Sequence, residues 1–174
     1  MAIGLDNGAR AQRKTLITVA EWGTDSAQKR EILGTRTEDS SIELNADIET
    51  TTDILGITYT DVNKTEPQQT FDPYYLLGGS ELGDYLYQAM IENKIDAYNN
   101  VFNIYIISAF IDSGTTSTHA YKAVKHTGCS IIPTSVGGES YVSMPIEVHF
   151  SNNITIGTVD KLGDDFKFTE TASV

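Results

Sequence analysis

The sequence predicts a mainly β domain, a β-sandwich or partly closed barrel with one flanking α-helix and one long connecting loop. Three observations predict this fold: many short runs rich in β-branched and aromatic residues, glycine-containing turns between them, and a single stretch with helical periodicity. A chain of 174 residues is expected to form one domain, residues 1–174, with a core of its own.

The clearest strand pattern is SIELNADIET, residues 41–50, in which apolar and polar residues alternate. Its apolar positions are Ile42, Leu44, Ala46 and Ile48. The opposite face carries three carboxylates and no cation: Glu43, Asp47 and Glu49. Alternating side chains point to opposite faces of a sheet, so we expect one buried and one wet face. Two interpretations of the acidic face stay open: simple solvated surface, or a wall that must not bind a polyanion.

The remaining strands are predicted from runs of β-branched and aromatic residues between turn signals. They are residues 15–22, 28–38, 101–111, 119–132, 141–150 and 153–159, with a short final strand around 166–168. The run 101–111 is too apolar to be exposed and is expected to be a central strand. Gly128 marks a bulge, and Pro145 places its strand at an edge or a bulge, because proline cannot donate to a ladder.

One helix is expected at residues 80–95. Ser80 occupies the N-cap position and acidic residues follow in the first turn. Apolar residues then recur at i, i+3 and i+4, the spacing of an amphipathic stripe that packs on a sheet. The predicted helix core consists of Leu82, Tyr85, Leu86, Ala89 and Met90.

Residues 51–79 are expected to form the long loop. Residues 54–62 could continue as a strand, but the next seventeen residues have no clear period and contain two prolines. The segment also carries large apolar side chains, at Phe71, Tyr74, Tyr75, Leu76 and Leu77. Disordered segments are poor in such residues, so we expect this loop to be covered, by its own domain or by another subunit. Residues 1–14 are expected to be a flexible arm, and residues 161–174 a polar tail.

Charge excludes one function class. Asp and Glu number 24 against 12 Lys and Arg, a net charge of −12, which argues against a protein that holds nucleic acid through phosphate contacts. Residues 1–30 are locally basic and could contact an acidic patch on a neighbouring copy. With one cysteine, no secretory signal and no long apolar run, we expect synthesis in a reducing cytoplasm and no membrane span.

The sequence contains no catalytic signature, and we expect neither enzymatic activity, nor a cofactor, nor a metal. His119, His126 and His149 form no cluster with metal-ligand spacing. Cys129 follows His126 by three residues, which in a strand places the two side chains on opposite faces, so a buried structural cysteine is favoured.

Residues 50–87, which begin TTTDILGITY and contain FDPYYLLGGSELGDYL, carry a family resemblance together with the preceding KREILGTRTEDSSIEL. The order of alternating strand, TTDILG-type turn, second strand, polar loop, FDPY-type segment and amphipathic helix resembles the major tail proteins, or tail-tube proteins, of long-tailed bacteriophages. The resemblance covers most of residues 15–160.

This resemblance implies a structural subunit whose rings of six stack into a hollow tail tube that conducts genomic DNA without specific binding. It implies that the long loop is inter-subunit and that lumen-facing residues are acidic, with Glu43, Asp47 and Glu49 as candidates. The implied partners are copies of the chain and the tail terminator, tape measure and distal tail proteins, and the implied location is the virion. The alternative is a soluble β-sandwich binding module for carbohydrate or adhesion, with Tyr74, Tyr75 and Tyr141 as a platform.

Overall fold

The computed structural model describes residue 5 and residues 8–24, 26–115 and 118–171. The predicted N-terminal arm therefore lies partly outside the described residues. The elements in chain order are η1 (Arg13–Thr15), β1 (Leu16–Trp22), β2 (Lys29–Ile32), β3 (Ile42–Glu43), β4 (Ala46–Thr52), β5 (Thr58–Thr65), β6 (Gln68–Phe71), α1 (Glu81–Ile91), η2 (Ile95–Ala97), β7 (Phe102–Asp112), β8 (Tyr121–Pro133), β9 (Ile146–His149), β10 (Ile154–Val159) and β11 (Phe168–Glu170).

The main sheet is antiparallel and open, in the order β2-β1-β7-β8-β9-β6-β3, with β10 and β11 branching from β8. The first half of β8 pairs with β10, and residues 130–133 pair with β9. Gly128 lies between the two pairings with φ of 77°, a left-handed conformation that glycine adopts without strain, and the register with β7 shifts there. The predicted bulge is confirmed, and it lets one long strand serve two parts of the sheet.

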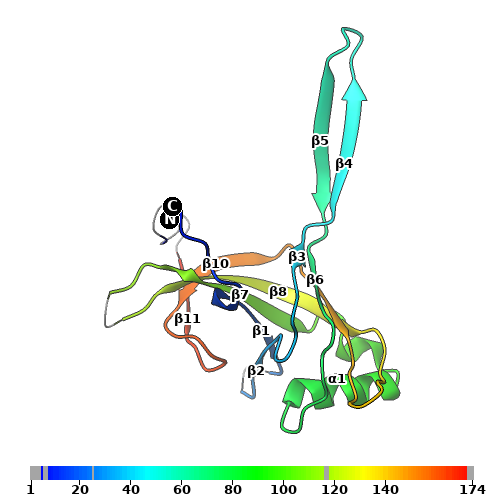
Figure 1. Cartoon of the computed structure of the whole chain (residues 1–174), viewed down its shortest axis with the longest axis vertical. Helices are drawn as coiled ribbons and strands as arrows, with labels where there is room; N and C mark the ends of the chain where they lie inside the picture. The colour runs from blue at the N-terminus through cyan, green and yellow to red at the C-terminus, as the bar shows by residue number, and fades with distance from the viewer. Residues whose placement is uncertain (1–4, 6–7, 25, 116–117, 172–174) are drawn as a thin grey trace.

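The two faces of the β1–β7–β8 layer bury different hydrophobic clusters. Ala20 and Ile104 belong to the larger cluster, together with Leu82 and Leu86 of α1. Their strand neighbours Val19 and Tyr105 belong to a smaller cluster on the other face. The helix and the β9–β6 part of the sheet cover the first face, and the C-terminal segment covers the second (Figure 1). The predicted mainly β, sandwich-like fold with one flanking helix is confirmed, as an open sheet rather than a closed barrel.

The helix begins where the sequence predicted and ends four residues earlier than expected. The Ser80 hydroxyl accepts a hydrogen bond from the Gly83 amide at 2.9 Å and so caps the first turn. Leu82, Leu86 and Ala89 are buried, and Tyr85 and Met90 are half-buried against the same cluster. The predicted helix core is therefore confirmed.

For residues 41–50, the prediction that one face of a single strand is buried is wrong. The chain breaks at Asn45, whose φ of 44° is left-handed, and this divides the run into β3 and β4. Every residue of β4 is exposed, and Leu44 and Ile48 are 61% and 59% exposed. β4 and β5 form a separate two-stranded ribbon, residues 46–65, which we call the arm; it projects from the sheet along the long axis of the molecule (Figure 1).

The long loop predicted at residues 51–79 is wrong as a unit. Most of it belongs to the arm and to β6, which pairs with β9 through Phe71 and Ile146. Only the stretch between β6 and α1 is irregular. The tail predicted as polar from residue 161 is wrong at Phe166, which is buried in the smaller cluster. The short final strand predicted around residues 166–168 forms two residues later, as β11, and pairs with β10.

The predicted strands differ most from the observed strands where the sequence contains a proline or only a short apolar stretch. The strands predicted at 15–22, 101–111, 119–132 and 153–159 are confirmed as β1, β7, β8 and β10. In contrast, 28–38 supplies only β2 and 141–150 only β9. The edge or bulge predicted from Pro145 is wrong, because this proline lies just before β9, which pairs on both sides without a register shift.

Candidate functional site

The arm is an amphipathic ribbon. Directly opposed residues of paired strands share a face, and the register opposes Ile48 with Val62 and, toward the tip, pairs of threonines. Ile48 and Val62 are 59% and 60% exposed. One face of the arm is therefore apolar and threonine-rich, and it is uncovered within the monomer.

The opposite face of the arm is acidic. Asp47 and Glu49 occupy alternate positions of β4 and share this face, and Asp61 lies directly across from Glu49. Lys64 lies across from Asp47 and also forms a salt bridge with Glu66, so three carboxylates face one cation along this side of the arm. The third predicted acid, Glu43, lies in β3 before the break at Asn45 and pairs with Gln68. The structure thus brings two of the three predicted acids together and adds Asp61, whose alternating context TYTDV could have identified it.

The tip of the arm is an ordered turn held by one carboxylate. Asp53 Oδ1 accepts hydrogen bonds from the Leu55 amide at 2.8 Å and the Ile57 amide at 2.9 Å. Oδ2 of the same residue accepts from the Tyr59 hydroxyl at 3.3 Å. Ile54 and Leu55 are nevertheless fully and 78% exposed. The tip therefore presents two aliphatic side chains on a fixed backbone.

A groove of about 280 Å³ lies where the loop before α1 meets the loop between β8 and β9. Figure 1 shows these two loops beside α1, at the end of the molecule opposite the arm. The two loops are joined by a hydrogen bond from the Leu76 amide to the Val142 carbonyl at 3.1 Å. The Tyr75 and Tyr141 rings meet edge to face, 6.4 Å apart. We call it the loop groove; its lining is Arg36, Tyr75, Leu76, Leu77, Tyr141 and Val142.

The five predicted loop candidates divide into two groups. Tyr75, Leu76 and Leu77 line the loop groove. Phe71 and Tyr74 are 1% and 5% exposed within the main core, so their assignment to an inter-subunit surface is wrong. Phe71 and Tyr74 pack within the core of their own domain. Burial raises the pKa of Tyr74, whose hydroxyl donates to Glu31 Oε1 at 3.1 Å.

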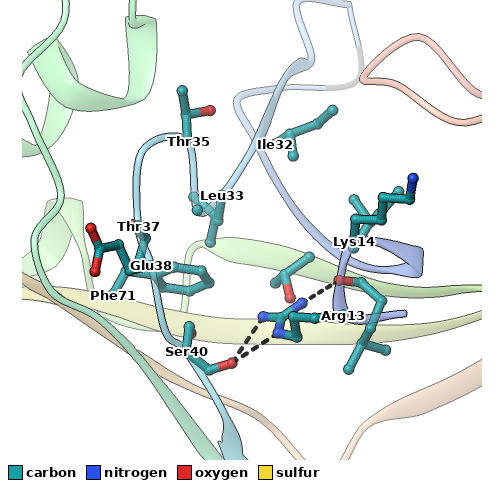
Figure 2. Close-up of a pocket in the computed structure, with 13 residues that line it drawn as sticks. Arg13, Lys14, Ile32, Leu33, Thr35, Thr37, Glu38, Ser40 and Phe71 are labelled. Atoms are coloured by element: carbon teal, nitrogen blue, oxygen red, sulfur yellow. Dashed lines mark hydrogen bonds between the residues drawn. The ribbon is translucent and has the colours of Figure 1, made fainter. Parts of the chain in front are cut away.

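A second cavity, of about 380 Å³, lies beside β1 and the segment that follows β2. Figure 2 shows the Arg13 side chain reaching the Ser40 carbonyl, to which Nη2 donates at 2.9 Å, while Lys14 extends elsewhere. Arg13 Nη1 also donates to the Leu16 carbonyl at 2.6 Å. The Arg13 guanidinium therefore ties the start of β1 to residue 40, and both Arg13 and Lys14 are exposed.

A buried charged network that sequence reasoning missed underlies the smaller cluster. Glu21, 1% exposed, accepts from Arg30 Nε at 2.6 Å, Asn103 Nδ2 at 2.9 Å and the Tyr105 hydroxyl at 3.2 Å. Arg30 also donates to the Phe166 carbonyl at 2.7 Å. Burial alone would raise the pKa of Glu21, but the hydrogen bonds from Asn103 and Arg30 and the nearby cations hold it below its usual value. The signal was an acid within the apolar run TLITVAEW.

The histidines and the cysteine lie in different surroundings and do not form one site. Asp112 accepts a hydrogen bond from the Ala120 amide and lies 2.6 Å from His119 Nδ1, and these contacts lower its pKa to about 2. His126 packs against Phe150, and Cys129 is 1% exposed with its thiol pKa raised by burial. Among the described residues, no three His, Cys, Asp or Glu side chains are grouped to hold a metal ion. None of the helices described is long and apolar enough to cross a membrane.

No family model and no curated protein matches the chain. Among solved structures, this chain is similar to a chain of the PVC sheath–tube complex, an extracellular contractile injection system in its extended state. The two chains are 14% identical with a TM-score of 0.43, and the match covers 82% of this chain and 88% of the other. This chain is also similar to the tube-terminating cap of the anti-feeding prophage, at 16% identity and a TM-score of 0.46, covering 91% and 99%.

Proposed function

We propose that this chain is a structural subunit that assembles with copies of itself into the tube of a phage tail or a tail-like particle. The observation that carries the proposal is the arm, an ordered ribbon whose apolar face and tip are uncovered in the monomer. The proposal includes no catalytic activity.

The arm needs a partner surface for a physical reason. An isolated two-stranded hairpin is marginally stable in water, and independent stability requires further strands or a packed face. At the base of the arm the Glu66 amide donates to the Leu44 carbonyl at 3.0 Å, and among the described strands β4 and β5 pair only with each other. Covering Ile48, Val62 and the tip residues would remove several exposed apolar side chains from water.

A copy of the same chain is the favoured partner. The net charge of −12 opposes nucleic acid as the covering partner. The open sheet ends in β2, β3 and β11, and such edges offer unpaired backbone groups to a neighbouring strand. Repetition of one edge pairing around an axis would close a ring, and the arm would link one ring to the next.

The finer features of the proposal come from the sequence resemblance. They are rings of six, passage of DNA during ejection, and association with the tail terminator, tape measure and distal tail proteins. The acidic arm face that contains Asp47 and Glu49 is suited to the channel wall, because negative walls repel DNA phosphates. The location would be the virion or an extracellular tail-like particle.

The test compares assembly of the full chain with that of a chain whose arm is replaced. Ala46 and Thr65 are cross-strand partners, so residues 47–64 can be exchanged for Asn-Gly, which closes a two-residue turn. Electron microscopy and sedimentation of the concentrated full chain should reveal tubes, and the arm-replaced chain should form no species larger than a single ring, with unchanged thermal unfolding. A control that changes two exposed apolar residues elsewhere, Ile91→Ser with Ile95→Ser, should still assemble. A full chain that stays monomeric at every concentration would overturn the proposal.

A further inference from the structure

We propose that the tip of the arm of one copy docks into the loop groove of the next copy, so that Ile54 and Leu55 fill the space between Arg36, Tyr75 and Tyr141. The inference rests on the proposed function, because it needs copies of the chain to associate. It adds the contact by which one copy binds the next, and it commits to a second copy as the occupant.

The tip has the properties of an inserted group. Its turn is fixed by the three hydrogen bonds that Asp53 accepts, so little backbone freedom would be lost on docking. Ile54 and Leu55 nevertheless stand in water, fully and 78% exposed. An ordered turn that holds aliphatic side chains in solvent is typical of a preorganised binding element.

The groove has the properties of a receptor for such a group. Its lining is aliphatic and aromatic apart from Arg36, and its rim residues Tyr141 and Val142 are 77% and 51% exposed. An apolar cavity of about 150 Å³ can hold a benzene molecule, so about 280 Å³ has room for a large aliphatic side chain. Insertion of the tip would remove both apolar surfaces from water together.

Charge favours the same pairing. Arg36 is exposed and, within the part of the chain that the structure describes, forms no salt bridge. The arm carries Asp53 at its tip and Asp47, Glu49 and Asp61 along one face. A cation at the mouth of the groove would attract this acidic ribbon and orient it, which is the usual contribution of charge to recognition.

The position of the two surfaces determines the geometry of association. The arm points away from one end of the molecule, and the loops that form the groove lie beside α1 at the opposite end (Figure 1). A copy therefore cannot fill its own groove. Contacts between two different surfaces of identical chains are head-to-tail and add copies without limit unless the rotation closes them into a ring.

Cysteine cross-linking of assembled protein tests the contact. The native Cys129 is 1% exposed and will not react, so cysteines can be introduced in pairs. A Leu55→Cys, Val142→Cys chain, assembled and treated with a short bismaleimide, should give a denaturing-gel ladder of dimers, trimers and longer species. The matched control is Leu55→Cys with Ile154→Cys, whose second site is 51% exposed in β10 and outside the groove, and it should give at least tenfold less ladder.

Three other results of the cross-linking experiment would contradict one or both proposals. Tubes that form without a Leu55–Val142 ladder would overturn the docking contact and leave the proposed function standing. Covalent dimers alone would overturn the head-to-tail arrangement, because they indicate reciprocal exchange of arms. If the unmodified chain forms no tubes, both proposals fail together.

A second variant tests the contact without a cross-linker. Leu55→Asp places a charge in the apolar groove and should raise the protein concentration needed for assembly at least tenfold, with monomer unfolding unchanged. Thr51→Asp adds the same charge on the acidic face of the same arm and should change that concentration much less. Equal effects of the two substitutions would contradict docking through the tip.

Discussion

Glu31 of β2 lies at the N-terminus of α1, where its Oε2 accepts a hydrogen bond from the Leu82 amide at 3.1 Å. Its other oxygen accepts from the Ser80 hydroxyl at 2.7 Å. A strand carboxylate thus completes the cap of the helix, at the end where the helix dipole favours negative charge. The relationship fixes the helix against the edge of the sheet and holds the adjoining loop before α1 in place.

Loss of this carboxylate should destabilise the fold. Glu31→Ala leaves the Leu82 amide and the Ser80 hydroxyl without this acceptor, and we expect the free energy of unfolding to fall by about 1–2 kcal/mol. Urea denaturation followed by circular dichroism measures the change. Glu139→Ala, in an exposed loop, is the control and should stay within about 0.5 kcal/mol of the unmodified chain.

The helix face is tested by two neighbouring residues. Leu86 is fully buried, so Leu86→Ala should lower the free energy of unfolding by about 2–5 kcal/mol through lost burial and a cavity. Tyr87 is 39% exposed, and Tyr87→Ala should cost much less. Thermal and urea unfolding of the two variants would contradict the packing if their effects were equal or reversed.

The Glu21 network predicts how stability depends on pH. The folded-state pKa of Glu21 is held below its unfolded value of about 4.3. Between these two values the unfolded chain binds more protons, so the stabilisation is complete above about pH 5 and is lost as pH falls through the folded pKa. Glu21→Gln should be less stable than the unmodified chain at pH 7, and the difference should shrink toward pH 3. A constant difference in urea midpoint across this range would exclude a Glu21 contribution.

Removing the cation of the same pair should be more damaging. Arg30→Gln leaves the Glu21 carboxylate buried with Lys125 Nζ at 3.9 Å as the remaining cation, and it also removes the bond to the Phe166 carbonyl. We expect a loss of about 3–5 kcal/mol at pH 7, the usual cost of an uncompensated buried charge. The double variant Glu21→Gln with Arg30→Gln should be less destabilised than the sum of the single variants, as a double-mutant cycle would measure.

Elements whose sequence pattern is local could be predicted from the sequence alone. The helix stripe around Leu82 and Leu86 and the dense apolar run of β7 have no other stable placement, and both were predicted correctly. The alternation in SIELNADIET was also read correctly as strand, but alternation reports only that one face differs from the other. It does not tell whether the apolar face meets a core in the same chain or a surface on another chain.

Long-range pairing explains the other differences. Phe71 and Tyr74 lie in a stretch without clear period, and they are buried because β6 pairs with β9, which lies about eighty residues further along the chain. The loop groove combines Arg36, Tyr75 and Tyr141 from three separate segments, and no sequence spacing relates them. The partners of Glu21 and Arg30 could not be predicted for the same reason, since Asn103, Tyr105 and Phe166 come from β7 and the C-terminal segment.

The last prediction concerns the acidic face of the arm, where Glu49 and Asp61 stand directly opposite each other. Like charges in this position destabilise a ribbon, by about 0.2–1 kcal/mol for such pairs. Asp61→Lys should therefore leave the monomer at least as stable as before, because it turns a repulsive pair into an attractive one. If the acidic face lines the channel, every copy in the tube would then offer a cation to DNA phosphates, and such contacts add together and weaken with salt. Assembled Asp61→Lys tubes should retain double-stranded DNA in co-sedimentation at low salt and release it at high salt, whereas unmodified tubes should retain none. Asp164→Lys makes the same charge change in the exposed C-terminal segment, so equal retention by both variants would mean that the acidic arm face does not line the channel.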